Sequence, residues 1–218
     1  TEFEKLLNAK TKVVFVNHIS NALGVINPIK KIITKAHEYN AAVLIDGAQA
    51  TPHMKIDVSE LDVDFYVTST HKICGPTGVG VLYGKEEWLN KIPPFLGGGE
   101  MIDKVTFEKS TYAGLPNKFE AGTPNISGVI ASGVAIDYLN GIGLDNINEY
   151  EKELLDYATS KLLEIKDLKI YGVSEEKTAV ISFNVGQIHP YDIGSIVDKF
   201  GIATRTGHHC AQPIMDYF

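Results

Sequence analysis

The 218-residue sequence has only two cysteines, Cys74 and Cys210, and no cluster of basic residues. The two cysteines match neither a disulfide framework nor a metal-ligand spacing, and the histidines share no metal spacing either, so we expect no metal. A formal net charge of -7 argues against nucleic acid or an anionic membrane surface as a partner. No apolar run approaches the roughly 20 residues of a membrane span, and the opening residues do not form a signal peptide. These absences favour a cytoplasmic protein.

The first part of the chain has the pattern of an α/β protein. Residues 13–18 form a β-branched and aromatic run, a helix with one apolar face follows Pro28, and residues 41–45 form a continuous apolar run typical of a buried parallel strand. This order predicts a βαβ unit. Further strands are expected over 64–68 and 78–83, where glycines flank the second run.

The second part has a different organisation. Residues 93–124 are rich in glycine and proline, which predicts an ordered loop excursion over the sheet. Beyond it the periodicity predicts a helix pair and then a smaller α+β unit. The expected elements are helices over 127–140 and 147–165, strands over 169–171 and 179–185, a helix over 191–200 and a strand over 202–205. A glycine-rich break places the domain boundary near Asn140, which gives domains 1–140 and 141–218.

Polar clusters follow the predicted strands at three points of the first part. Asn21 comes after the first strand, Asp46 and Gln49 after the second, and Ser69 to Lys72 after the third. Ligands of open α/β sheets bind beyond the carboxyl ends of the strands. We therefore expect these clusters to converge on one edge of the sheet.

Lys72 and Asp46 are the residues whose chemistry is most informative. A lysine at the end of a buried strand can form a Schiff base with a carbonyl cofactor, and a carboxylate opposite can keep a pyridinium nitrogen protonated. The neighbouring Gly75-Pro76-Thr77-Gly78 turn lets the backbone pass close to an anion. The sequence leaves two simpler interpretations open: Lys72 as a surface lysine, and Asp46 as a turn residue before Gly47.

A thiol with polar neighbours stands near the end of the chain. Cys210 is surrounded by His208, His209, Gln212 and Pro213, which suits a reactive thiol in a loop more than a small buried hydrophobe. Arg205 is either a solvated strand end or a bidentate partner for a carboxylate or phosphate. Cys74, between Ile73 and Gly75, is interpreted as a structural, buried cysteine.

With these residues in hand, the chain resembles the pyridoxal-phosphate-dependent cysteine desulfurases of the SufS type, in the class V aminotransferase group. The resemblance covers essentially the whole chain. It rests on five blocks: Ser20 to Gly24, Asp46 to Gln49, Ser69 to Lys72 with Gly75 to Gly78, Phe119 to Pro124, and Arg205 to Pro213. The first three blocks fit several class V enzymes, whereas a cysteine within the last one is characteristic of the SufS branch.

The resemblance implies a fold, a reaction and a set of site residues. The fold is that of fold type I pyridoxal-phosphate transferases, a mostly parallel sheet with helices on both faces and a smaller α+β C-terminal domain. The reaction converts L-cysteine to L-alanine and leaves the sulfur as a persulfide on Cys210, for iron-sulfur cluster assembly through an acceptor protein of the Suf system. The implied roles are Lys72 as the Schiff-base lysine, Asp46 at the pyridinium nitrogen, Gln49 at the phenolic oxygen, Ser69 and His71 at the phosphate, Thr123 at the phosphate of the other subunit of a homodimer, and Asn21 and Arg205 at the substrate or ring substituents.

The chain also departs from this family. Such enzymes have roughly 400 residues, and neither the upstream histidine that stacks on the cofactor ring nor a downstream arginine for the substrate carboxylate is present. We therefore expect a fragment, which as an isolated polypeptide binds the cofactor weakly or does not turn over. Two alternatives stay open: a selenocysteine lyase or other class V lyase, and a non-catalytic binding or scaffold module.

Overall fold

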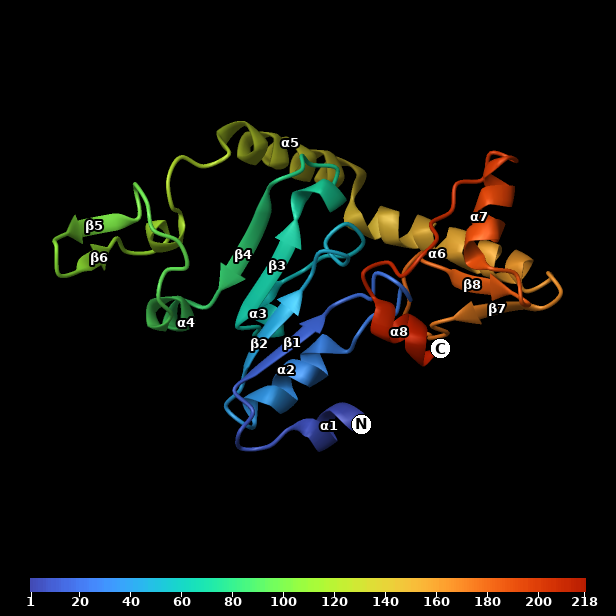
Figure 1. Ribbon diagram of the computed structural model, residues 1–218, viewed down its shortest axis with the longest axis horizontal. Helices are drawn as coiled ribbons and strands as arrows, with labels where there is room; N and C mark the ends of the chain where they lie inside the picture. Colours follow the sequence, from blue (N-terminus) through green and yellow to red (C-terminus); the bar gives the residue numbers. More distant parts are fainter.

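The computed structural model describes residues 1–218 and is built around a four-stranded sheet with the order β1-β2-β3-β4 (Figure 1). The strands are β1 Val13–Asn17, β2 Ala42–Asp46, β3 Phe65–Ser69 and β4 Gly80–Gly84. Strands β1, β2 and β3 run parallel to one another, and β4 runs antiparallel to β3. The expectation of an α/β fold with a mostly parallel sheet is confirmed.

Eight α-helices, two short 3-10 turns and two small hairpin sheets complete the chain. The α-helices are α1 Glu2–Leu6, α2 Ile29–His37, α3 Val58–Leu61, α4 Glu86–Lys91, α5 Ile126–Ile142, α6 Leu144–Leu162, α7 Pro190–Asp198 and α8 Gln212–Tyr217. The 3-10 turns are η1 Thr70–Lys72 and η2 Asn117–Phe119, and the hairpins pair β5 Ile102–Val105 with β6 Ser110–Tyr112 and β7 Leu168–Tyr171 with β8 Ser182–Val185. No single helix has the length and hydropathy of a membrane span; α5 and α6 meet that criterion only as a pair bent by 69°.

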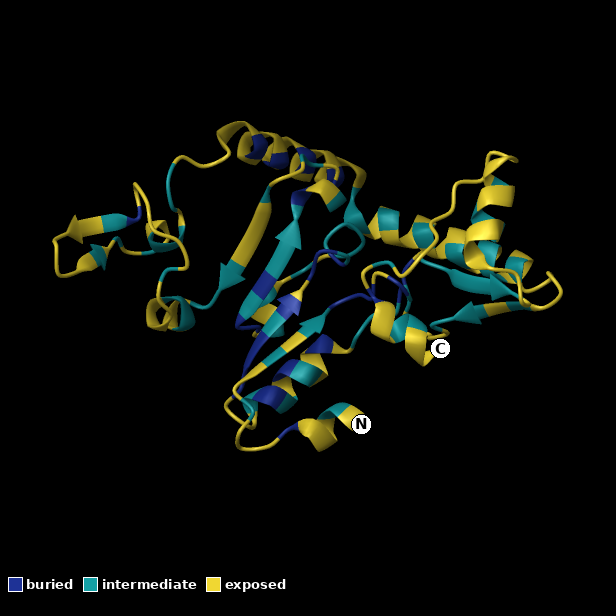
Figure 2. Ribbon diagram, in the orientation of Figure 1, coloured by how far each residue is buried: buried dark blue, intermediate teal, exposed yellow.

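The core lies between α2 and the first strands of the sheet. Ile29, Ile33 and Ala36 recur at spacings of three and four residues, so that they share one face of α2. They pack with Val43 and Ile45 of β2, all of them buried (Figure 2). Replacing Ile33 with alanine would cost roughly 2–5 kcal/mol, the usual cost of a cavity in such a core.

A buried carboxylate, that of Asp64, links several elements by hydrogen bonds at the amino-terminal edge of the sheet. Asp64 is 3% exposed and accepts hydrogen bonds from the Val43 amide at 2.7 Å, from His37 Nε2 at 2.8 Å and from Trp88 Nε1 at 3.1 Å. Lys85 adds an ion pair at 3.3 Å. Burial acts to raise the pKa of Asp64, but the bonds from His37 and Val43 and the nearby positive charges outweigh it, so the pKa lies below its usual value. This network joins α2, β2, β3 and α4 at the edge opposite the candidate site.

Two expectations about local structure are wrong. The glycine- and proline-rich segment is not a loop over the sheet, because it contains the β5–β6 hairpin, which projects away beyond α4 (Figure 1). Residues 202–205 do not form a strand. The backbone of residues 203–207 makes no hydrogen bond, and a strand needs a partner for its backbone amides and carbonyls.

The smaller α+β unit is present after α5, with β7 and β8 beside α6 and α7 (Figure 1). Helices α5 and α6 meet at Gly143, whose φ of +89° is a conformation that favours glycine. The break therefore lies three residues beyond Asn140. The division into domains 1–140 and 141–218 stays a prediction.

Candidate functional site

The carboxyl edge of the parallel strands carries the candidate site. Asp46 is the last residue of β2, and its register partner on β3 is Val67, two residues before the end of that strand at Ser69. The turn η1 then begins at once and carries Lys72. Because neighbouring strands lie about 5 Å apart, the carboxylate and the amine are held at the same edge by adjacent strands.

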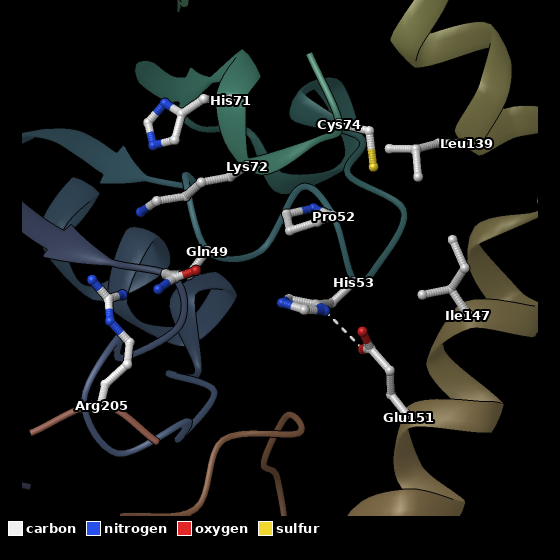
Figure 3. A pocket seen from close by; sticks show the side chains of 10 residues that line it. All are labelled: Gln49, Pro52, His53, His71, Lys72, Cys74, Leu139, Ile147, Glu151 and Arg205. Atoms are coloured by element: carbon white, nitrogen blue, oxygen red, sulfur yellow. Dashed lines mark hydrogen bonds and ion pairs between the residues drawn. The ribbon is translucent and has the colours of Figure 1, made fainter. Parts of the chain in front are cut away.

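A cavity of about 600 Å³ opens at this edge, a size typical of small-molecule sites. In Figure 3, Lys72, Gln49 and Arg205 point towards one another on one side of it, and His53 and Glu151 meet on the other. Both parts of the chain contribute to its walls. The ten lining residues are Gln49, Pro52, His53, His71, Lys72, Cys74, Leu139, Ile147, Glu151 and Arg205.

The Lys72 turn is held rigidly by the residue at its start. The Thr70 side chain is buried and donates to the carbonyl of Pro76 at 2.7 Å, while the Thr70 carbonyl accepts from the amides of Ile73 and Gly75 at 2.9 Å each. A Cβ at Gly75 would lie 2.8 Å from that carbonyl oxygen, so the turn requires glycine there. The half-buried Lys72 forms no ion pair, and its amine is free to meet a ligand.

A buried pair of uncharged rings lies near Asp46. Gly47 packs directly on the ring of Tyr66, whose hydroxyl lies 3.0 Å from Nδ1 of His18. Burial lowers the pKa of His18 to about 4, and burial together with the charge of Asp46 raises the pKa of Tyr66. Both rings are therefore uncharged at neutral pH. The Asp46 carboxylate accepts a hydrogen bond from the Ala48 amide at 2.9 Å and forms no ion pair, which leaves it available to a cationic ligand atom.

The structure brings together four of the residues singled out from the sequence, because Gln49, His71, Lys72 and Arg205 line the cavity. Asp46 and Ser69 lie at the ends of the strands beside it. The remaining three do not line it. Asn21 and Cys210 lie in two different loops, which are joined by a hydrogen bond from Asn21 to the carbonyl of His209. Thr123 is exposed in the segment between η2 and α5.

Three polar or thiol side chains of the cavity wall, those of His53, Glu151 and Cys74, were not assigned to the site from the sequence. His53 Nδ1 and a carboxylate oxygen of Glu151 form a pair at 2.7 Å, half-buried on both sides. They are 98 positions apart, so no local pattern could indicate the contact. The interpretation of Cys74 as a buried structural cysteine is wrong: it is exposed, with a φ of +63°, because the tight turn after Lys72 presents it at the cavity.

The donor set of this edge fits pyridoxal phosphate. An unpaired amine suits an aldehyde, an unpaired carboxylate suits a protonated ring nitrogen, and the hydroxyl, imidazole, amide and guanidinium groups around them suit a phosphate and a substrate carboxylate. In chain order these residues are Asp46, Gln49, Ser69, His71, Lys72 and Arg205.

Fold and site together define an α/β protein whose ligand site lies at the carboxyl edge of a mostly parallel sheet. The family model described as aminotransferase class-V matches residues 1–218, and the chain belongs to that family.

Relatives within this family are named as cysteine desulfurases. The chain is 51% identical over 218 residues to the cysteine desulfurase of Enterobacter sp. (strain 638), which covers 100% of this chain and 53% of that protein. It is 50% identical over 216 residues to the probable cysteine desulfurase of Streptomyces coelicolor, which covers 98% of this chain and 52% of that protein. The chain thus spans about half the length of the curated relatives it matches.

Two solved structures support the same fold. The apo cysteine desulfurase from Thermococcus onnurineus NA1 superposes with a TM-score of 0.92 at 39% identity, covering 99% of this chain and 54% of that one. The cysteine desulfurase CsdA from Escherichia coli has a TM-score of 0.91 at 35% identity, covering 96% of this chain and 52% of that one. The expected architecture, that of the cysteine desulfurases, is confirmed.

Proposed function

We propose that the protein is a pyridoxal-phosphate-dependent cysteine desulfurase, which converts L-cysteine to L-alanine and leaves the sulfur as a persulfide on Cys210. The observation that carries this proposal is the placement of the unpaired Lys72 amine at the same sheet edge as the unpaired Asp46 carboxylate, beside a cavity that Gln49 and Arg205 also line. The curated relatives named as cysteine desulfurases support it.

The residues at the sheet edge would hold the cofactor from several sides. Lys72 would bind its aldehyde carbon, Asp46 its ring nitrogen and Gln49 its phenolic oxygen, while Ser69 and His71 would bind the phosphate. When bound, the cofactor supplies an electron sink for the carbon that carries the substrate amine. Asp46 forms no ion pair, and the nearby His18 and Tyr66 are uncharged, so the carboxylate would stay available to the ring nitrogen.

The remaining site residues would act on the substrate. Arg205 would bind the cysteine carboxylate through its planar guanidinium, with Asn21 beside it. The Lys72 amine would take the proton from the substrate Cα. The Cys210 thiolate would then attack the substrate sulfur, so that an S–S bond forms as the C–S bond breaks. The bonding pair of the C–S bond stays with carbon, which takes up a proton and leaves as alanine.

We also infer the setting of this reaction. The cysteine within Arg205 to Pro213 favours the SufS branch, with an acceptor protein of the Suf system and iron-sulfur cluster assembly as the destination of the sulfur. Thr123, exposed outside the cavity, fits a role in the partner site of a homodimer. Helix α5 exposes Ile130 and Val134 to solvent, which supports a partner surface that covers this helix. Two free cysteines fit a reducing cytoplasm.

The proposal is tested by three variants of the complete protein, reconstituted with pyridoxal phosphate. Lys72→Ala should lose the visible absorbance of bound cofactor, because no other amine of the cavity can replace it. Cys210→Ala should keep that absorbance and lose alanine formation from cysteine. Cys74→Ala is the matched control, since it removes the other exposed thiol and should retain alanine formation.

The outcomes separate the alternatives. Full alanine formation by Cys210→Ala would overturn the assignment of the sulfur acceptor. Turnover of selenocysteine but not of cysteine would instead indicate a selenocysteine lyase. Absence of any cofactor absorbance in the unmodified protein would favour a scaffold or binding module.

A further inference from the structure

The loop that carries Cys210 has an unusual backbone and few bonds. Gly207, His209 and Cys210 all have positive φ, at +106°, +51° and +57°. For residues other than glycine this conformation is disfavoured, so neighbouring contacts must maintain it. Within the loop the backbone forms one hydrogen bond, from the Ala211 amide to the His208 carbonyl at 2.8 Å.

Asn21 forms the one hydrogen bond that ties this loop to the rest of the molecule. Its Nδ2 donates to the carbonyl oxygen of His209 at 2.6 Å, across 188 positions of sequence. No other side-chain hydrogen bond and no ion pair reaches residues 203–211, and their backbone groups bond only within residues 203–218. The bond lies immediately before Cys210, at a residue with positive φ.

Asn21 is itself attached to a rigid base. The amide of Thr178 donates to the Gly24 carbonyl at 2.9 Å, and the amide of Ile26 donates to the Glu176 carbonyl at 3.0 Å. The hydroxyl of Ser182 donates to the Ala22 carbonyl. A Cβ at Gly24 would lie 2.9 Å from the backbone oxygen of Val180, so the two segments are in close contact. The loop bearing Asn21 is therefore fixed to the segment that leads into β8.

We propose that Asn21 is a positioning residue for Cys210: its amide fixes the backbone beside the thiol through the His209 carbonyl, and so limits where Cys210 can meet the substrate. The inference deepens the proposed function, because it rests on Cys210 as the sulfur acceptor. Asn21 keeps its second N–H and its carbonyl oxygen for a ligand. Release of this single bond would free the loop, so that the thiol, which lies outside the cavity lining, can move between the substrate and an external acceptor.

Hydrogen–deuterium exchange of the complete protein, with and without bound cofactor, tests the hydrogen bond between Asn21 and His209 directly. In Asn21→Ala and Asn21→Asp, the amide of Ala211, which is the one hydrogen-bonded amide of the loop, should exchange about two- to tenfold faster, the effect expected from losing one neutral hydrogen bond. Asn21→Asp keeps the shape but lacks the donor, so it separates hydrogen bonding from packing. Asn146→Ala is the matched control, because it removes another exposed side-chain-to-backbone bond of 2.6 Å, to Ile142.

Alanine formation gives the functional readout. Both Asn21 variants should lower kcat more than they raise KM, and iodoacetamide should alkylate Cys210 faster relative to Cys74 in the same molecule. Unchanged exchange of the Ala211 amide, or faster exchange with unchanged kcat, would overturn the proposal. The exchange experiment needs no turnover, so it distinguishes a failure of this inference from a failure of the desulfurase assignment, which Cys210→Ala decides.

Discussion

Substituting Gly47 with alanine should destabilise the protein strongly, because this glycine lies against a ring that cannot move. An alanine Cβ would lie 2.0 Å from Cε1, 2.1 Å from Cζ and 2.2 Å from Oη of Tyr66. Tyr66 is 4% exposed on β3, and its hydroxyl is engaged by His18. Overpacking of a well-packed site costs roughly 1–3 kcal/mol. Contacts this short place Gly47→Ala near about 3 kcal/mol.

Urea unfolding of the complete protein measures this cost, and a double-mutant cycle assigns it. Tyr66→Ala removes all three atoms that the new Cβ would meet. The double variant Gly47→Ala/Tyr66→Ala should therefore be more stable than the sum of the single effects by about 2 kcal/mol. Gly97→Ala is the control, since a Cβ there has no neighbour within 4 Å. A change below about 0.5 kcal/mol for Gly47→Ala, or strict additivity in the cycle, would refute this account of the packing.

Two further predictions concern buried ionisable groups. Folding lowers the pKa of His18 from an ordinary 6.5 to about 4, so between these values the unfolded chain binds a proton that the folded chain does not. The free energy of unfolding should therefore fall by about 2 kcal/mol as the pH is lowered from 7 to 5. In urea titrations His18→Gln should flatten this pH dependence, and an unchanged dependence would contradict the assignment. Asp64→Asn should cost about 3 kcal/mol in thermal or urea unfolding, because it leaves His37 and Lys85 without their buried partner; Asp103→Asn, at an exposed carboxylate of β5, is the control.

Much of the fold could be predicted from local patterns. The alternation and length of apolar runs located β1, β2 and β3 to within one or two residues, since buried strands require such runs. The helix pair α5 and α6 followed from periodicity. The strand expected over 202–205 was wrong because a short apolar run forms a strand only when another strand supplies backbone partners, which local sequence does not specify.

Part of the site was equally readable. Residues that follow parallel strands converge at their carboxyl edge, so Asp46, Gln49 and Lys72 could be placed together before any coordinates. The pairing of His53 with Glu151 and the exposure of Cys74 could not, because they depend on how α6 and the Lys72 turn pack.

By itself, then, the sequence determined the order of strands and helices, the family blocks and the amine and carboxylate of the candidate site, since these depend on residues near one another along the chain. Only the tertiary structure decided that His18 and Tyr66 are uncharged near Asp46 and that Asn21 holds the loop of Cys210. Desolvation and contacts between residues more than a hundred positions apart exist only once the chain has packed.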